Sequence, residues 1–459
     1  MKMKRLTLVL CAVFTAVPAK LCGQTINMVT DMGAFNNGTN ATANTKAFQN
    51  AFFQYPNGKI IVPPGNYAID NSQGAITITN FNGELKFEGS AILQFQNNIQ
   101  GGFRFLGGTG MRIEGMHGNY PNAPTQRAGT EFSFTGSVDA FVKDITAENS
   151  PGAAIMFTSC IRPKVINAVA TNSIADGFIF ANSQDAQLVN LTTNHTLDNG
   201  LALYNYLIYD DLHGATISNV RVTNSYAHGI AVVGTSHVTI SGFAVDKTRG
   251  SAVFIGQDPT YQTRISDQVT VEHGYVRGSG TLNPPGGTTF GLEYNQPVSV
   301  VFSDIQVEGS NGRSVSGMGP SSRVYVRNVR ARGNLASDDF VFYKTAYADV
   351  MNCSSENSTG AGFIFNGVNS VVARRLTSIN SSRASSLNRA MWFQDNGYVN
   401  AGGLLVVDNQ AVPTGFIVGT SNSPGLTEAG SIQGVGSGIV HGTLRIQNYA
   451  SGTHFSQVY

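Results

Sequence analysis

Apolar and polar residues alternate in short runs that return along most of the chain. Alternation with a period of two, rich in β-branched residues and punctuated by Asn, Gly, Ser and Asp, is typical of β-strands. Apolar side chains occupy every second position in pairs such as Phe178/Phe180, Leu201/Leu203, Ile230/Val232 and Phe363/Phe365. The pattern therefore predicts an all-β chain of many short strands.

The turns before these runs repeat with a nearly fixed spacing. Each turn holds a marker residue followed by Gly or another small residue, and neighbouring markers are 23 residues apart in four cases and 25 to 37 apart in the others. A period of about 20–50 residues indicates a solenoid, in which each unit buries its apolar face against its neighbours. The markers are Ala153, Asp176, Asn199, His228, Ser251, Thr288, Arg313, Asp338, Ala361, Met391 and Phe416.

Two other repeat architectures fit the sequence less well. Leucine-rich repeats would need a recurrent Leu/Asn consensus with a helix in each unit, which the chain lacks, and propeller blades of about 40–50 residues are too long. We therefore predict one elongated domain, a right-handed parallel β-helix of about eleven or more coils with three short strands in each.

The N-terminal region contains the one helical pattern that we identify. Ala47/Ala51 and Phe48/Phe52 recur at positions i and i+4, which predicts a short amphipathic helix over 44–53 with Asn44 as its N-cap. The helix would cover the open end of the solenoid, whose terminal coil otherwise exposes apolar residues and unpaired strand edges.

The chain divides into four predicted parts. Residues 1–23 have the basic start and the apolar run, Leu6 to Val17, of a secretory signal peptide. We assign 24–75 to an N-terminal cap module, 76–420 to the coils and 421–459 to a C-terminal tail or cap. No other apolar run reaches the roughly 18–20 residues of a membrane span. The sequence thus predicts a secreted protein, extracellular or periplasmic, with no membrane span.

Net charge and cysteine content give two further expectations, one about partners and one about the thiols. Without residues 1–23, 25 basic residues stand against 28 acidic ones, which gives no basic footprint for nucleic acid. Cys160 and Cys353 lie several coils apart, so we expect both to be buried free thiols. The oligomeric state is left open by the sequence.

Candidate catalytic residues occupy three successive marker positions. Asp176, Asn199 and His228 occupy equivalent positions in successive repeats, so we expect them to lie above one another on successive coils, with Asp198 beside Asn199. Coils rise by about 4.8 Å, so Asp176 and Asp198 are expected roughly 5–8 Å apart. At about 5 Å and an effective dielectric near 20, two carboxylates repel by about 3 kcal/mol, which raises the pKa of one of them. One could then donate a proton while the other stays ionised.

Further residues surround this column in the sequence. The loop 204–213 offers Tyr204 and Tyr209 as faces for sugar stacking, Asp211 as another catalytic carboxylate and His213 as a binding residue. Arg249, Arg264 and Glu293 are expected to reach the same groove and bind substrate. The alternative interpretation is structural, because Asp and Asn before Gly are favoured turn formers in any β-helix.

Two segments near the N-terminus resemble a known superfamily. The combination of Asp-Met-Gly-Ala (31–34), a short helix and Ile-Val-Pro-Pro-Gly-Asn-Tyr (61–67) is similar to the N-terminal module of the pectate-lyase-like β-helix proteins. That superfamily includes polygalacturonases, glucanases, polysaccharide lyases and phage tailspikes. The resemblance implies the same fold and does not select a reaction.

The marker column resembles the polygalacturonase site. That family has an Asn-Thr-Asp-Gly turn, an Asp-Asp pair one coil later and a Gly-His-Gly turn one coil further. The corresponding segments here are 172–177, Asp198-Asn199-Gly200 and Ala227-His228-Gly229. The resemblance implies catalytic roles for Asp176, Asp198 and His228. The chain departs from the family at Asn199, which stands where the family has its general acid.

The leading hypothesis is therefore an enzyme that cleaves a polysaccharide or oligosaccharide by glycoside hydrolysis, with Asp176 and Asp198 as the working carboxylates, His228 in support and Asn199 binding substrate. No metal or cofactor is predicted. A lyase or uronan epimerase at the same groove is the first alternative, and Ca²⁺ would then be possible. A non-catalytic glycan-binding β-helix and a recruited small-molecule isomerase are the others.

Overall fold

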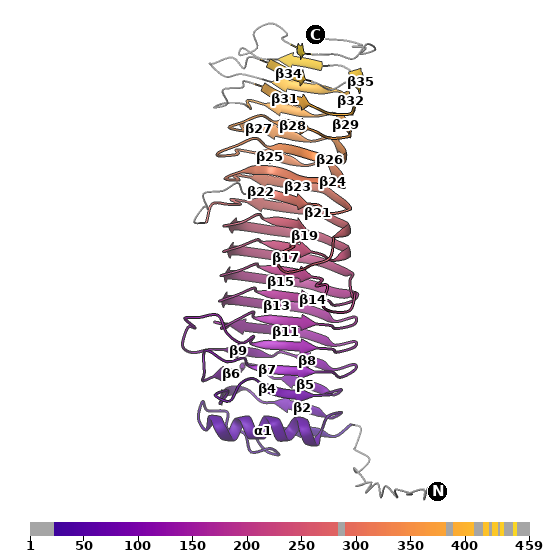
Figure 1. The fold of residues 1–459 in the computed structure, drawn as a ribbon. Coiled ribbons are helices and arrows are strands. Elements are labelled where there is room, and N and C mark those ends of the chain that lie inside the picture. The colour runs from indigo at the N-terminus through magenta and orange to yellow at the C-terminus, as the bar shows by residue number, and fades with distance from the viewer. Residues whose placement is uncertain are drawn as a thin grey trace, which may run out of the picture.

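The chain forms a right-handed parallel β-helix of about 13 turns, which confirms the predicted fold class. The computed structural model describes residues 23–282, 290–381 and 389–407, together with the backbone of strands at 416–421, 425–429, 432–435 and 444–447. Figure 1 shows the coils rising from the one helix near the N-terminus towards the C-terminus. The predicted signal peptide lies outside the described residues except for Gly23.

The strands form three parallel stacks, one on each side of the coil. The first stack carries the turns with the marker residues at its entrance. It consists of β4 (Ile76–Thr79), β7 (Phe103–Leu106), β10 (Phe132–Thr135), β12 (Ile155–Thr158), β14 (Phe178–Ala181), β16 (Leu201–Tyr204), β18 (Ile230–Val233), β20 (Val253–Gly256), β22 (Phe290–Asn295), the first halves of β24 (Arg313–Arg327) and β26 (Phe340–Met351), β28 (Phe363–Asn366), β31 (Arg389–Gln394), β34 (Phe416–Ser421) and β37 (Leu444–Gln447).

The second stack follows the first along each coil. It consists of β1 (Thr25–Asn27), β2 (Lys59–Val62), β5 (Glu84–Phe87), β8 (Arg112–Glu114), β11 (Phe141–Glu148), β13 (Lys164–Ser173), β15 (Ala186–Thr196), β17 (Ala215–Ser225), β19 (Ser236–Thr248), β21 (Asp267–Arg277), β23 (Ser299–Glu308), the second halves of β24 and β26, β29 (Ser370–Arg374), β32 (Tyr398–Gly402) and β35 (Gly425–Ala429).

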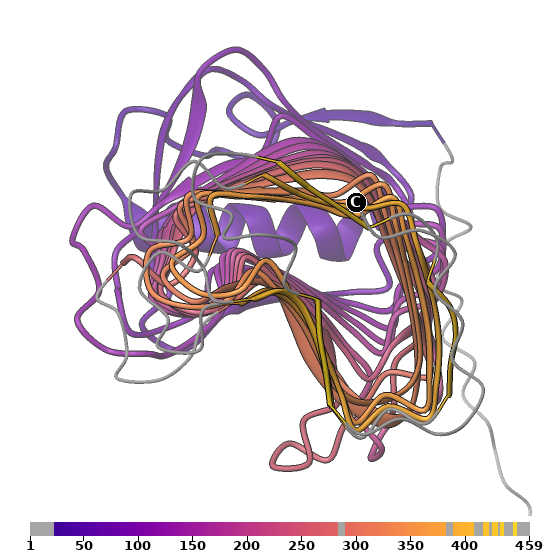
Figure 2. The same cartoon turned by 90° about the horizontal axis from the view of Figure 1, so that it is seen from above.

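The third stack closes the coil. It consists of β3 (Gly65–Ile69), β6 (Ala91–Phe95), β9 (His117–Asn119), the second halves of the long strands β11 to β23 of the second stack, β25 (Arg330–Arg332), β27 (Ser354–Glu356), β30 (Thr377–Ile379), β33 (Leu404–Val407) and β36 (Ile432–Val435). Seen along the axis, the coils superpose in an L-shaped outline (Figure 2).

Stacked aromatic rings fill part of the interior. Phe105, Phe134, Phe157 and Phe180 follow one another on successive coils with ring centroids 4.9, 4.5 and 5.0 Å apart. The strand spacing of about 4.8 Å matches the separation at which rings pack, so one residue type can repeat at the same inward position. The alternation read from the sequence is the alternation between this core and the outer surface.

The long strands bend where the second stack meets the third. The bend residues Asn167, Asn190 and Asn219 have left-handed backbones with φ of 55°, 57° and 56°. Their side-chain amides form a ladder, because Asn190 Nδ2 donates to Asn167 Oδ1 at 2.9 Å and Asn219 Nδ2 donates to Asn190 Oδ1 at 3.1 Å. Asparagine suits this corner because it tolerates the left-handed region and can pair with its copy one coil away.

Helix α1 (Ala41–Gln54) covers the N-terminal end of the solenoid (Figure 1), as the sequence predicts. Its Phe48 and Phe52 rings pack against Phe103 at 5.5 and 6.3 Å. The predicted cap was wrong: the N-cap is Asn40, and Asn44 lies buried within the first turn. Asn44 Nδ2 donates to the Ala68 carbonyl oxygen at 3.0 Å, so its amide joins the helix to β3 instead of capping the helix.

Two predicted markers were assigned to the wrong position. Strand register places Phe290 beside Arg313, and Arg389 beside Phe416, in the row of markers that contains Asp176. Thr288 lies outside the described residues, and Met391 pairs two positions further along, with Phe363. Both errors follow insertions, which change the spacing that the sequence count relied on.

Three other predictions concern the ends and the thiols. Cys160 and Cys353 are free and buried, as expected. The described strands of the predicted tail continue the three stacks, and the remainder of 421–459 lies outside the described residues. None of the described helices is long and apolar enough to cross a membrane.

Candidate active site

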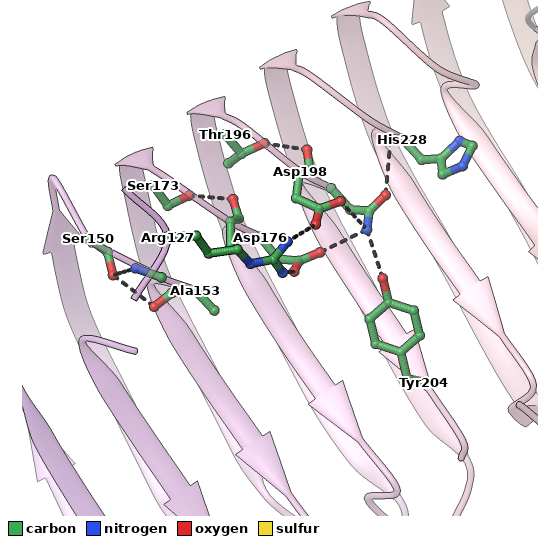
Figure 3. Close-up of polar contacts among 12 residues, drawn as sticks. Arg127, Ser150, Ala153, Ser173, Asp176, Thr196, Asp198, Tyr204 and His228 are labelled. Atoms are coloured by element: carbon green, nitrogen blue, oxygen red, sulfur yellow. Dashed lines mark hydrogen bonds and ion pairs between the residues drawn. The ribbon is translucent and has the colours of Figure 1, made fainter. Parts of the chain in front are cut away.

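A row of buried hydroxyl groups shapes the turns that lead into the first stack. Ser173 Oγ donates to the Ala175 carbonyl at 3.1 Å, and Thr196 Oγ1 donates to the Asp198 carbonyl at 3.1 Å. Ser225 Oγ also donates to the Asp198 carbonyl, at 2.9 Å. Figure 3 shows the hydroxyls of Ser173 and Thr196 on successive coils, each beside the turn that it holds. The turns carrying the polar column are therefore fixed from inside the solenoid.

The glycine after each marker is required by close packing between coils. A β-carbon on Gly177 would lie 2.6 Å from the Gly200 carbonyl oxygen, and one on Gly200 would lie 2.7 Å from that of Gly229. Real β-carbons do not approach backbone oxygen so closely, so the glycines let neighbouring turns stack. Close packing between coils thus explains the glycine of the Asp-Gly, Asn-Gly and His-Gly pairs. It does not restrict the marker side chain, which can face outwards.

Asp176, Asp198 and Asn199 come together on two neighbouring coils. Asn199 Nδ2 lies 2.8 Å from Asp176 Oδ1 and 3.3 Å from Asp198 Oδ1. Because one nitrogen reaches both oxygens, these oxygens can be at most about 6 Å apart. Figure 3 shows both carboxylates directed towards the same guanidinium, that of Arg127.

The orientation of the Asn199 amide follows from its partners. The backbone N–H of His228 donates to Asn199 Oδ1 at 3.0 Å, and a backbone N–H can only donate. The NH₂ group must therefore face the carboxylates and the Tyr204 hydroxyl, which lies 2.9 Å from Nδ2. Asn199 is 3% exposed, so it links Asp176, Asp198 and Tyr204 as a buried donor.

Arg127 reaches the two carboxylates from a distant excursion of the chain. Its Nη1 lies 3.0 Å from Asp198 Oδ2 and its Nη2 lies 3.9 Å from Asp176 Oδ2. The Arg127 side chain is 62% exposed, whereas Asp198 is 28% exposed and Asp176 only 2%. The cation is thus held at the rim, over a carboxylate pair that differs in access to water.

The two aspartates therefore occupy different electrostatic environments. Burial is the main cause that raises the pKa of Asp176, to about 7, and the charge of Asp198 raises it further. The Asn199 hydrogen bond and Arg127 oppose this shift without cancelling it. Near neutral pH a large fraction of Asp176 is consequently protonated, which makes its carboxyl group a proton donor.

His228 is a neutral histidine packed under the groove. The Ser251 backbone N–H donates to His228 Nδ1 at 3.1 Å, which assigns the ring proton to Nε2. Burial lowers the pKa of His228 to about 4, although Asp198 and the Ser251 hydrogen bond raise it. The ring stacks on Phe254 with centroids 4.8 Å apart. At neutral pH it can donate a hydrogen bond from Nε2 but carries no charge.

These residues line a groove of about 270 Å³ on the outer face of β14, β16, β18 and β20. Five predicted site residues border it: Asp176, Asp198, Asn199, Tyr204 and His228. The Tyr204 ring stacks on that of Tyr206 at 5.4 Å, and Phe254 and Tyr261 provide further aromatic walls. The groove thus combines an acid–base pair with aromatic surface.

Four predicted site residues form a separate cluster at the base of the 204–213 loop. Asp211 Oδ1 lies 3.3 Å from both His213 Nδ1 and Arg264 Nε, and it accepts a 2.7 Å hydrogen bond from Asn205. The Tyr209 carbonyl accepts from Arg264 Nη2 at 3.2 Å, and its ring is 46% exposed. None of the four borders the groove. The contacts of Asp211, His213 and Arg264 help to fold the loop, and the predicted roles of the four residues at the substrate stay predictions.

The remaining two predicted residues lie elsewhere. The Arg249 guanidinium lies 4.5 Å from the centre of the Tyr226 ring and does not border the groove, and its predicted role in substrate binding stays a prediction. Glu293 lies on the first stack, but one strand beyond Phe254, where it lines a second pocket. Glu293 was expected in the groove with Asp176 and Asp198, and it borders the second pocket instead.

Sequence reasoning missed several groove residues. Arg127 lies in an excursion that has no repeat register, so no sequence signal placed it. Phe254 could have been found, because register aligns it with Ile179, Ala202 and Ala231 on the outward row. Among the described residues, no group of three or more His, Cys, Asp or Glu side chains is placed to hold a metal ion. The possible Ca²⁺ of a lyase remains a prediction.

Comparison with known proteins finds similarity in structure and none in sequence. No protein-family model matches the chain, and no curated protein matches it. The N-terminal fragment of bacteriophage Phi29 gene product 12 aligns with a TM-score of 0.64 and 13% identity, over 90% of this chain and 79% of that one.

Two solved enzymes align less closely. A family 28 exopolygalacturonase from Yersinia enterocolitica gives a TM-score of 0.49 at 15% identity, over 72% of this chain and 76% of its own. The A-module of a mannuronan C-5 epimerase from Azotobacter vinelandii gives 0.44 at 12%, over 95% and 100%. At such an identity the likeness to the phage protein shows a shared fold alone.

Proposed function

We propose that this protein is an exported enzyme that cleaves a polysaccharide by glycoside hydrolysis in the groove on the first stack. The observation that carries the proposal is the pairing of a buried, largely protonated Asp176 with the part-exposed Asp198 across Asn199. Glycoside hydrolysis needs two carboxyl groups on opposite sides of the scissile bond, one protonated and one ionised. Two carboxyl groups in unlike environments supply that difference.

The roles follow from the surroundings of each carboxyl group. Asp176 donates the proton to the leaving oxygen, because burial keeps the proton on it near neutral pH. Asp198, closer to solvent and paired with Arg127, acts as the ionised partner that activates water or attacks the sugar. Asn199 holds the two in a fixed relation and is a positioning residue.

Aromatic side chains support a carbohydrate substrate. Tyr204, Tyr206, Phe254 and Tyr261 border the groove, and aromatic faces pack well against the apolar faces of sugar rings. The resemblance of 172–177, 198–200 and 227–229 to polygalacturonase turns is consistent with this substrate class. The basic start and apolar run of residues 1–23 support export.

A panel of neutral and acidic polysaccharides tests the proposal. The mature protein should release new reducing ends from at least one of them, and Asp176→Asn should reduce turnover by about 10²–10⁴-fold, as expected for loss of an acid–base group. Asp185→Asn, at an exposed left-handed corner, is the matched control and should leave turnover unchanged. Full turnover in Asp176→Asn, or glycan binding without cleavage of any polymer, would contradict the proposal.

A further inference from the structure

A second, larger pocket continues along the same face of the solenoid. It encloses about 490 Å³ over β22, β24, β26 and β28. The first groove ends at Phe254, and the second pocket begins at Glu293, which is the register partner of Phe254 on the next coil. Neighbouring coils are about 4.8 Å apart, so the two hollows form consecutive stretches of one face.

The second pocket holds a part-buried cation with unused donors. Within the described residues Arg313 takes part in no ion pair, and its Nε is shielded from solvent without a hydrogen-bond partner. Nη1 donates to Ser316 Oγ at 3.3 Å, and the guanidinium carbon lies 5.9 Å from the centre of the Phe290 ring. Burial lowers the pKa of Arg313, which reports the cost of keeping this charge away from water.

The two acidic groups of the pocket each accept a hydrogen bond from another part of the chain. Asp338, one coil beyond Arg313, accepts a 2.7 Å hydrogen bond from the Ala361 backbone N–H. Glu293 accepts a hydrogen bond from the Ser251 hydroxyl on the previous coil. Burial raises the pKa of Glu293 to about 7, so this group is often neutral and then repels an anion little. The charge of Asp338 still acts on Arg313 and raises its pKa, but no carboxylate among the described residues forms a direct ion pair with the guanidinium.

We propose that this second pocket binds an anionic group of a glycan, a uronate carboxylate or a sulfate ester, with Arg313 as the residue that pairs with it. A guanidinium offers a planar fork of donors that matches such an anion. The apolar walls, Val341, Tyr343 and Ile364, suit the ring that carries the anion. The glycan identity rests on the proposed function, whereas the anion preference rests on Arg313 alone.

Calorimetric titration of the mature protein tests this directly. The probes are an oligogalacturonate, a sulfated carrageenan oligosaccharide and a neutral galactan oligosaccharide of the same length. At least one anionic probe should bind about tenfold or more tightly than the neutral one, and less tightly as salt is added. The tighter of the two anionic probes identifies the source of the anion. Equal binding of neutral and anionic probes, or no binding of either anionic probe, overturns the proposal.

Variants of Arg313 test whether the anionic group binds in the second pocket. Arg313→Gln should weaken anionic binding by about tenfold to a hundredfold, and Arg313→Lys should weaken it less because the charge remains. Arg323→Gln, on the same strand but on another, exposed face, is the matched control and should bind as the wild type does. Circular dichroism checks folding, and the salt dependence of the wild type needs no variant. Wild-type affinity in folded Arg313→Gln would overturn the assignment.

The single tryptophan provides an independent readout. Trp392 is the register partner of Ile364, which lines the second pocket, so anionic probes should change its fluorescence. Asp176→Asn should leave this response unchanged, because Asp176 lies in the first groove. Loss of turnover with the response retained would separate the two sites. A normal response in a protein that cleaves no glycan would refute the proposed hydrolysis and keep the anion site.

Discussion

Arg127 Nη1 lies 3.0 Å from Asp198 Oδ2, although 71 positions separate the two residues in the chain. The contact brings an excursion between β9 and β10 over the turn that carries the acidic pair. A cation above two carboxyl groups affects which of them keeps its proton. The geometry of this corner therefore determines both the access to the groove and its dependence on pH.

Removing Arg127 should shift the pH dependence of turnover. Asp176 must be protonated to act as an acid, so activity should fall as pH rises through its raised pKa of about 7. Arg127 lowers that pKa, so Arg127→Gln should move the alkaline limb of the kcat profile upwards. An exposed ion pair contributes up to about 1 kcal/mol, which limits the shift to less than about one pH unit. Arg162→Gln is the control, and a downward shift in Arg127→Gln would contradict the assignment.

Thr196→Val should separate positioning from stability. The buried hydroxyl donates to the Asp198 carbonyl at 3.1 Å, and valine keeps the shape without the donor. We expect kcat to fall by about 10- to 100-fold with little change in KM, because small displacements of a catalytic group are costly. Thr248→Val removes the equivalent hydroxyl two coils away, which donates to Gly250, and should leave kcat unchanged. Equal losses in both variants would indicate general destabilisation.

Glu131→Gln should stabilise the protein at high pH. Glu131 is fully buried, and burial raises its pKa well above the ordinary value, although a backbone hydrogen bond with Glu148 opposes the shift. A raised folded-state pKa gives stability that is complete below the unfolded pKa, about 4.3, and is lost as pH rises through the folded one.

The advantage of the glutamine variant should therefore be small near pH 4 and grow to about 1–3 kcal/mol at alkaline pH. Thermal unfolding of both proteins across that range measures it. Glu88→Gln replaces an exposed glutamate and should show no such trend. A difference that is independent of pH would mean that Glu131 is not the group responsible.

The asparagine ladder can be tested at Asn190. Asn190→Ala removes two ladder hydrogen bonds and puts at φ of 57° a residue that tolerates the left-handed region less well than asparagine, which should cost about 1–2 kcal/mol. Asn190→Gly removes the same bonds but accommodates the backbone, so its apparent Tm should fall less. If glycine proves the more destabilising of the two, the left-handed backbone is not what selects asparagine at this corner.

The fold was predictable because each repeat contains strands in which apolar and polar residues alternate. Register confirms the row of Asp176, Asn199 and His228, since Phe178, Leu201 and Ile230 pair on successive coils. Period two and a spacing near 23 residues suffice for such a row, as each strand must bury one face. One available signal was overlooked, the Ser or Thr three residues before the markers, at Ser173, Thr196 and Ser225.

The positions of residues on insertions could not be predicted in the same way. Tyr209, Asp211 and His213 lie on a loop that is not part of the repeat. Arg264, which contacts Asp211 and the Tyr209 carbonyl, lies on another insertion. Arg127 was missed for the same reason. A repeat specifies where its strands lie, but a loop packs according to contacts that the period does not encode.

Digestion of the cleaved polysaccharide in oxygen-18 water, followed by mass spectrometry of the products, tests the central claim most directly. Glycoside hydrolysis by Asp176 and Asp198 predicts one oxygen-18 atom in each new reducing end from the wild type. It predicts almost no product from Asp176→Asn and Asp198→Asn. Unsaturated products without the label, an epimerised polymer that stays uncleaved, or labelled products at the wild-type rate from either variant would contradict it.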